Sequence, residues 1–181
     1  MRIIAGIARS TPLTAPRGHN TRPTSDKSRE ALFNILSQSI QEARFLDLFC
    51  GSGAVGIEAL SRGAKHAAFV DSSRAAQEAT LANLHKTKLI HKSEFFKLNA
   101  LKALDNFQKG GEGFNIIFLD PPYDDTIMLN KTLQKSPSLL MDDGIIIAET
   151  DINAKIIIPD SLELISRREY GRMCFLFFKY K

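Results

Sequence analysis

The sequence has few features of a membrane-spanning, secreted or metal-binding protein. None of its apolar runs approaches the roughly 18 residues that a membrane-spanning helix needs. A short apolar stretch at the start is interrupted by Gly6 and Arg9, so it does not resemble the core of a signal peptide. The two cysteines, Cys50 and Cys174, lie far apart, and the four histidines show no metal-ligand spacing. We therefore expect a cytoplasmic protein of a reducing environment, with no metal and no membrane association.

Acidic residues are absent from the first 25 positions, which contain Arg2, Arg9, Arg17 and Arg22. The whole chain has 24 Lys and Arg residues against 20 Asp and Glu residues, a net charge of +4. All of the excess positive charge therefore lies in this leading segment. Such a segment is either a solvated tail or an arm that binds a polyanion.

The length and the hydrophobic pattern predict one α/β sheet domain. The chain has 181 residues, of which 44% are hydrophobic and 24% are charged, a usual balance for a globular fold. Strands are expected at 45–49, 67–71, 94–98, 115–120 and 144–149, and helices at 54–62, 74–85, up to about 107, and 127–135. Since these strands are apolar on both faces, the pattern indicates a parallel sheet covered by helices.

The two ends of the chain differ from this central pattern. Runs at 162–170 and 173–180, separated by Gly171, predict a terminal antiparallel hairpin that completes a mostly parallel sheet of seven strands. At the front we expect a strand at 2–8, a loop at 12–18 and a helix capped by Thr24 or Ser25. The apolar stripe predicted for this helix consists of Leu32, Ile35, Leu36 and Ile40. We therefore divide the chain into residues 1–40, an arm and a helix that pack on the sheet, and a main domain of residues 41–181.

A glycine-rich loop follows the first strand of the main domain. Gly51, Gly53 and Gly56 have the spacing of a dinucleotide-binding loop, and Asp71 follows Gly51 by 20 residues. A tight turn without a ligand is the alternative. Asp47 would face the pyrophosphate of a dinucleotide and repel it, whereas it suits the sulfonium and ammonium groups of S-adenosylmethionine. The sequence therefore favours this methyl donor, and we add Phe49 in the same loop to the expected cofactor-binding residues.

Two further residues are candidates for the nucleoside part of the donor. Asp71, at the end of the second strand, can accept hydrogen bonds from both ribose hydroxyls. Asn99, after the third strand, pairs with the adenine edge or is a plain turn residue. Once the sheet is built, no residues remain for the second domain of a dehydrogenase.

The fourth strand of the main domain leads directly into Asp120, Pro121, Pro122 and Tyr123. Two prolines cannot continue a strand ladder, so the chain leaves the sheet there in a rigid conformation. The Asp120 carboxylate and the Pro121 carbonyl can accept both N–H bonds of an exocyclic amine, and Tyr123 can stack on a flipped-out base. The pattern predicts direct methyl transfer to a nucleobase amine, catalysed by Asp120, Pro121 and Tyr123.

These motifs resemble the amino-methyltransferases that use S-adenosylmethionine, and more narrowly the bacterial 16S rRNA guanine-N2 methyltransferase family, RsmD. The resemblance rests on residues 2–6, 21–36, 47–64, 69–71 and 120–123, and it covers nearly the whole chain. The 21–36 block is its specific part, because the Asp-Pro-Pro-Tyr motif also occurs in DNA adenine methyltransferases.

The resemblance implies a Rossmann-like methyltransferase fold and methylation of the N2 amine of one guanine (the family target is guanine 966) in 16S rRNA. It implies a small ribosomal subunit or late assembly particle as partner and S-adenosylmethionine as donor. By position, Asp120 and Tyr123 would act on the base, and Gly51, Gly53 and Asp71 would contact the donor. The expected RNA contacts are Arg2, Arg9, Arg17, Arg22, Lys27 and Arg29. We expect a monomer.

Two other functions remain open at this stage. One is a DNA adenine-N6 methyltransferase, although no separate segment for reading a duplex sequence is evident. The other is an RNA-binding assembly factor that keeps the fold without turnover. Two further groups of basic residues, at 86–97 and 167–172, are expected to be solvated surface.

Overall fold

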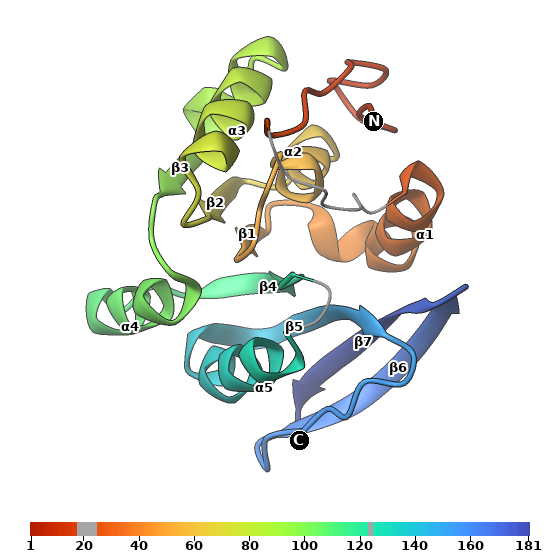
Figure 1. Cartoon of the computed structure of the whole chain (residues 1–181), viewed down its shortest axis with the longest axis vertical. Coiled ribbons are helices and arrows are strands. Elements are labelled where there is room, and N and C mark those ends of the chain that lie inside the picture. Colours follow the sequence, from red (N-terminus) through yellow and green to blue (C-terminus); the bar gives the residue numbers. More distant parts are fainter. Residues whose placement is uncertain (18–24, 123–124) are drawn as a thin grey trace.

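A seven-stranded sheet organises the chain, as the sequence predicted. The computed structural model describes residues 1–17, 25–122 and 125–181. In this part the strands lie in the order β3-β2-β1-β4-β5-β7-β6 (Figure 1). Their bounds are β1 (Arg44–Asp47), β2 (His66–Val70), β3 (Ser93–Phe96), β4 (Phe114–Leu119), β5 (Leu140–Asp151), β6 (Leu162–Tyr170) and β7 (Met173–Tyr180). Strands β1 to β5 pair in parallel, and β7 is antiparallel to both β5 and β6.

Helices cover both faces of the sheet and enclose two apolar layers. The helices are α1 (Asp26–Leu36), α2 (Ala54–Ser61), α3 (Arg74–Lys86), α4 (Ala100–Gly110) and α5 (Thr126–Lys135), with 3-10 turns at Ser37–Ile40, Ile90–Lys92 and Ser136–Leu139. One core joins α1, α2 and α3 to one face of the sheet, and the second joins α4 and α5 to the other. This confirms the expected α/β fold. Among the described residues, no helix is both long enough and apolar enough to cross a membrane.

Helix α1 begins where its sequence predicts. Ser25 is the N-cap, and its hydroxyl accepts a hydrogen bond from the backbone N–H of Ser28 at 3.0 Å. Leu32 and Leu36 are buried as expected, but the prediction that Ile35 belongs to the buried stripe is wrong, because its side chain is 42% exposed. Phe33 is buried in its place, so the helix is rotated toward Phe33 relative to the expected stripe.

The predicted strand at 2–8 does not form. Residues 1–17, which we call the arm, fold back on themselves through one isolated bridge between Arg2 and Pro12. The backbone N–H groups of Ile4 and Ala5 donate instead to the carboxylate of Glu58 on α2, at 2.8 and 3.0 Å. Because side chains of α2 and α3 satisfy this backbone, the arm lies over those helices (Figure 1) rather than beside a strand.

The terminal hairpin inserts its second strand into the sheet. Residues 173–178 of β7 are buried in succession, since β7 lies between β5 and β6 and is covered on both faces. Gly171 lies at the hairpin turn with a φ of +67°, in the left-handed region that glycine adopts without strain. Strand β6 forms the outer edge and is largely exposed. The predicted hairpin is therefore confirmed.

Candidate active site at the carboxyl edge of the sheet

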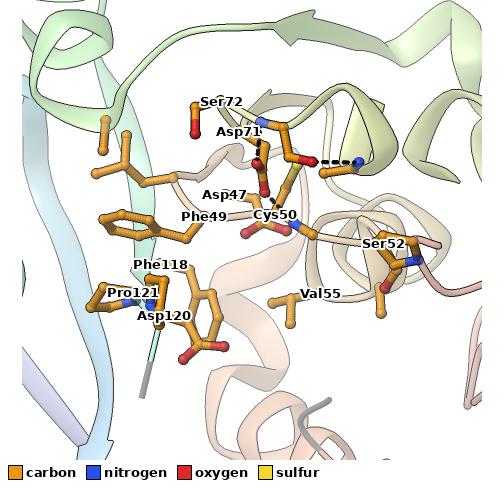
Figure 2. A pocket seen from close by; sticks show the side chains of 18 of the residues that line it. Asp47, Phe49, Cys50, Ser52, Val55, Asp71, Ser72, Phe118, Asp120 and Pro121 are labelled. Atoms are coloured by element: carbon orange, nitrogen blue, oxygen red, sulfur yellow. Dashed lines mark hydrogen bonds between the residues drawn. The ribbon is translucent and has the colours of Figure 1, made fainter. Parts of the chain in front are cut away.

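A cavity of about 510 Å³ opens where the parallel strands end. Four strand-to-helix connections form much of its wall, namely residues 47–52, 71–73, 98–100 and 120–122. Its volume lies within the range of small-molecule sites, and the carboxyl edge of a parallel sheet is where such sites form. Figure 2 shows Asp71 and Ser72 at one end of this cavity and Asp120 with Pro121 at the other.

The glycine loop after β1 is held open toward the cavity. Gly51 has a φ of +53°, and a Cβ added there would meet no atom within 4 Å, so a ligand can approach its backbone closely. Asp71 fixes the loop, since its carboxylate accepts from the N–H of Gly51 at 3.0 Å and from that of Ser73 at 2.8 Å (Figure 2). Thr80 on α3 donates its hydroxyl to the Gly51 carbonyl at 3.0 Å. Hydrogen bonds with Asp71 and Thr80 therefore hold the loop in place, and no atom blocks Gly51 from the cavity.

Asp47, the last residue of β1, places a buried carboxylate on the cavity wall. It is 2% exposed and accepts a hydrogen bond from the Gly56 N–H at 3.0 Å. Burial raises the pKa of Asp47 to about 7, the Gly56 hydrogen bond opposes this shift, and the nearby Asp71 carboxylate adds to it. Because burial and a neighbouring carboxylate disfavour the ionised form, a cation bound in the cavity would favour it and lower this pKa again.

Asp120 follows β4 and lies at the opposite end of the cavity from Asp71. Burial raises the pKa of Asp120 well above its usual range, and repulsion from the carboxylates of Glu149 and Asp47 raises it further. Pro121, which follows it, is buried and fixes the direction of the chain. An acid with a raised pKa and the carbonyl of a conformationally restricted proline thus lie beside the cavity.

Most residues predicted for the cofactor and for catalysis lie on this one cavity. The lining includes Asp47, Phe49, Gly51, Asp71, Asn99, Asp120 and Pro121. Gly53 is not part of the described lining; it is the N-cap of α2, with a φ of +75°. Asn99 caps α4, since its side-chain oxygen accepts a hydrogen bond from the Leu101 N–H at 3.0 Å. Tyr123 lies outside the described residues.

The predicted RNA contacts fall into three groups. Arg2, Arg9, Arg17 and Lys27 are exposed. Arg22 lies outside the described residues. Arg29 is buried completely, with a side-chain exposure of 0%, so the expectation that it contacts RNA from the surface is corrected. The physical reason is the docking of the arm, since Arg29 donates hydrogen bonds to the Arg2 backbone carbonyl and to Asp26.

The sequence interpretation missed several residues of the cavity wall. Met1 and Pro16 of the arm, Arg29 of α1 and Met128 of α5 all contribute to the lining. Nothing in the local pattern indicates these positions, because they reach the cavity only through the packing of the arm and the two helices. Asp125 also lines the cavity, and the position of this Asp shortly before a helical pattern was a possible signal for its capping role.

The chain is similar to known proteins over nearly its full length. A family model described as Conserved hypothetical protein 95 matches residues 1–179. Ribosomal RNA small subunit methyltransferase D of Escherichia coli K12 is 33% identical over 181 residues, which covers 97% of this chain and 87% of the relative. The corresponding enzyme of Haemophilus influenzae is 31% identical, covering 94% of this chain and 89% of the relative.

Solved structures share this fold over nearly the whole chain. A hypothetical protein of Thermus thermophilus superimposes with a TM-score of 0.84 at 30% identity, covering 98% of both chains. A ribosomal protein L11 methylase of Lactobacillus delbrueckii shares the fold, with a TM-score of 0.70 at 19% identity over 96% of this chain and 85% of that one. The chain therefore belongs to the family described as Conserved hypothetical protein 95, the RsmD family.

Proposed function

We propose that this protein transfers the methyl group of S-adenosylmethionine to the exocyclic N2 amine of a guanine in 16S rRNA. The proposed substrate is the small ribosomal subunit or a late assembly particle, and the finer target is guanine 966. A ribosomal substrate would place the activity in the cytoplasm, and we propose that the protein acts there as a monomer.

One observation carries this proposal: a single cavity joins the glycine loop and its acids to Asp120 and Pro121. A glycine loop at the carboxyl edge of a sheet occurs in proteins that bind many different ligands, and an acid at the end of a strand also occurs in turns that bind none. Their convergence supplies one site for the donor and another for the amine, beside each other. The relatives named rRNA small subunit methyltransferase D support rRNA as the acceptor.

The cavity wall suits the donor better than it suits a dinucleotide. S-adenosylmethionine supplies an electrophilic methyl group on a cationic sulfur. Asp47 is a buried carboxylate whose ionised form a cation would favour, whereas a pyrophosphate would be repelled by it. Each carboxylate oxygen of Asp71 accepts one backbone hydrogen bond and retains room to accept one more from a ribose hydroxyl.

The residues after β4 would orient and deprotonate the base. The Asp120 carboxylate and the Pro121 carbonyl accept the two N–H bonds of the amine and direct its lone pair at the methyl carbon. As the new N–C bond forms and the S–C bond breaks, Asp120 takes the proton that the nitrogen releases. The positive charge of the donor opposes the repulsion from Glu149 and Asp47, so it favours the ionised Asp120 that this step needs. Tyr123 is proposed to stack on the flipped-out base.

The test uses methyl-labelled S-adenosylmethionine with unmodified small subunits, naked 16S rRNA and duplex DNA, followed by nucleoside analysis. We expect label in N2-methylguanosine from the small subunits. Label in N6-methyladenine from DNA would replace the proposal with DNA methylation. Binding of the donor without label in any substrate would favour a role in assembly without turnover.

A variant separates the proposed chemistry from cofactor binding. Asp120→Asn should lower kcat by about 100-fold or more, because the amide cannot accept the proton, while the affinity for S-adenosylhomocysteine changes little. Asp142→Asn is the control, since Asp142 is an exposed acid outside the described cavity lining. Near-normal turnover of Asp120→Asn would show that Asp120 does not have this role.

A further inference from the structure

The cavity wall contains a buried cation whose hydrogen bonds are incomplete. Arg29 on α1 is 0% exposed and belongs to the cavity lining. Its Nη2 donates to Asp26 Oδ1 at 2.9 Å and to the Arg2 carbonyl. Among the described residues, however, no group accepts a hydrogen bond from its Nε or Nη1. Buried donors are rarely left unpaired, so these two atoms point to acceptors that the described residues do not supply.

The neighbouring carboxylate of Glu58 does not fill this role. Its Oε2 lies 3.8 Å from Arg29 Nε, which is within the range of a charge interaction but beyond that of a hydrogen bond. Both Glu58 oxygens already accept from the arm, through the N–H groups of Ile4 and Ala5, and Oε1 also accepts from Arg62 Nε at 2.7 Å. Other donors therefore hold the Glu58 carboxylate in place, and it does not move closer to Arg29 to accept a hydrogen bond from Nε.

The charges around the cavity indicate which kind of acceptor fits. Of the described residues that line it, Asp47, Asp71, Asp120 and Asp125 are acidic, whereas Arg29 alone has a basic side chain. The donor of the proposed reaction has a cationic sulfonium, a cationic ammonium and one carboxylate. The acids suit the two cationic groups, and the only anionic group of the donor requires a basic partner. The guanidinium of Arg29 has the charge that a carboxylate needs, and its unpaired Nη1 can donate a charge-assisted hydrogen bond to one carboxylate oxygen.

The position of Arg29 agrees with the direction in which the donor would lie. Arg29 contacts Glu58, which is one helical turn beyond Ala54 on α2, and Figure 1 shows α1 and α2 as neighbours. Arg29 therefore meets the cavity at its α2 end, away from Asn99, where the adenine is expected. An extended donor with its nucleoside at Asp71 and Asn99 directs its amino-acid part toward that α2 end.

We propose that Arg29 binds the carboxylate of the amino-acid part of the methyl donor through its Nη1 atom. This inference rests on the proposed function, because it assigns one more contact to the same donor. An RNA phosphate is a poorer occupant, since Arg29 is enclosed between the arm and α2 while its exposed neighbour Lys27 is free to reach RNA.

The test compares two ligands that differ only in the carboxylate, S-adenosylhomocysteine and its decarboxylated analogue. Binding of each is measured by calorimetry to the wild-type chain and to Arg29→Met, with Lys102→Met as a control that removes an exposed cation on α4. We expect the wild type and the control to prefer the carboxylated ligand by about ten- to hundredfold. In Arg29→Met this preference should fall to near unity, while the affinity for the decarboxylated ligand changes little.

The ratio of affinities separates a contact from a structural role. Weakening of both ligands by the same factor would overturn the proposal and assign Arg29 to holding the arm. Equal affinity of the wild type for the two ligands would overturn it without any variant. If Arg29→Met does not fold, Arg29→Lys should retain a reduced preference, and an undiminished one would overturn the proposal. Binding of neither ligand by the wild type would instead contradict the proposed function itself.

Discussion

The two ends of the chain are attached to the central sheet and its helices in different ways. The C-terminal hairpin adds β7 and β6 through main-chain hydrogen bonds and buries a run of apolar side chains, residues 173–178. The arm adds no strand, and its backbone is held by Glu58, Ser61 and Asn83 of the neighbouring helices. Only the arm reaches the described cavity lining, through Met1 and Pro16. Changes in the hairpin should therefore affect stability, whereas changes in the arm should also reach the site.

The largest effect is expected from truncating a buried aromatic residue of the hairpin. Phe178 is 0% exposed, pairs with Ile146 on β5 and does not contribute to the described cavity lining. Phe178→Ala should lower the free energy of unfolding by about 3–5 kcal/mol, because it leaves a cavity in the core. Denaturant titration measures this loss. Affinity for S-adenosylhomocysteine, measured where the variant remains folded, should stay unchanged.

A partner of Phe178 across the hairpin provides the control. Leu164 on β6 pairs with Phe178 in register but is 41% exposed, so Leu164→Ala should cost less than about 1 kcal/mol. A large loss of ligand affinity in Phe178→Ala would contradict the separation of the hairpin from the site.

The arm should be most sensitive at Gly6. Its φ is +83°, and a Cβ there would lie 1.8 Å from the backbone oxygen of Ser61, a contact that only movement of the arm could relieve. Gly6→Ala should therefore lower the free energy of unfolding by about 2–4 kcal/mol and weaken cofactor binding as well. Gly111→Ala is the matched control, since Gly111 has a φ of +69° but open space around it, and only the strain of about 1 kcal/mol is expected. If Gly6→Ala and Gly111→Ala lower the free energy of unfolding by similar amounts, the arm relieves the contact with Ser61 at little energetic cost.

The contrast between the two ends also explains which features the sequence predicts. The hairpin follows from a local pattern, since two apolar runs flank Gly171, and pairing between adjacent runs needs no information from elsewhere. The glycine loop and Asp120 follow from spacing relative to strands that are themselves apolar enough to recognise. These residues line one cavity in the structure, so the sequence indicates where on the sheet that cavity lies.

The arm and Arg29 could not be predicted in the same way. Both depend on Glu58, a charged residue of α2 that a sequence pattern would place on the surface but that is 0% exposed. Its carboxylate replaces a neighbouring strand as acceptor for the arm, so the run at 2–8 has strand-like composition without a strand partner. Once the arm docks and its Arg2 carbonyl accepts from Arg29, the Arg29 side chain is enclosed and lines the cavity instead of lying on the surface.

A smaller effect is expected at the asparagine that ties the arm to α3. Asn83 is fully buried, accepts from the Thr14 N–H at 2.8 Å, and donates to the Thr14 and Ser52 carbonyls, both at 2.9 Å. Asn83→Ala should cost about 2 kcal/mol, because it leaves these backbone groups unpaired. Since Ser52 belongs to the glycine loop, affinity for S-adenosylhomocysteine should also fall by about threefold or more.

The C-terminal half contains a matching asparagine. Asn130 on α5 accepts from the Ile157 N–H at 2.8 Å and donates to the Lys155 carbonyl at 3.1 Å, and it is only partly buried. Asn130→Ala should cost about 1 kcal/mol and leave ligand affinity unchanged. Thermal melts and calorimetry on the two variants test the comparison, which fails if both change ligand affinity equally.

The smallest effect concerns RNA and leaves stability nearly unchanged. Arg9 and Arg17 are exposed on the arm and have no ion pair among the described residues, whereas Arg172 of the hairpin turn lies 4.0 Å from Asp151. Replacing Arg9 and Arg17 with Gln should reduce the salt dependence of RNA binding by about 1.4–1.8 units of log–log slope, as expected for two lost phosphate contacts. The same replacement of Arg168 and Arg172 should leave the slope unchanged. Filter binding of 16S rRNA over a series of KCl concentrations gives both slopes. A slope that changes only when Arg168 and Arg172 are replaced would place the RNA at the hairpin and not at the arm.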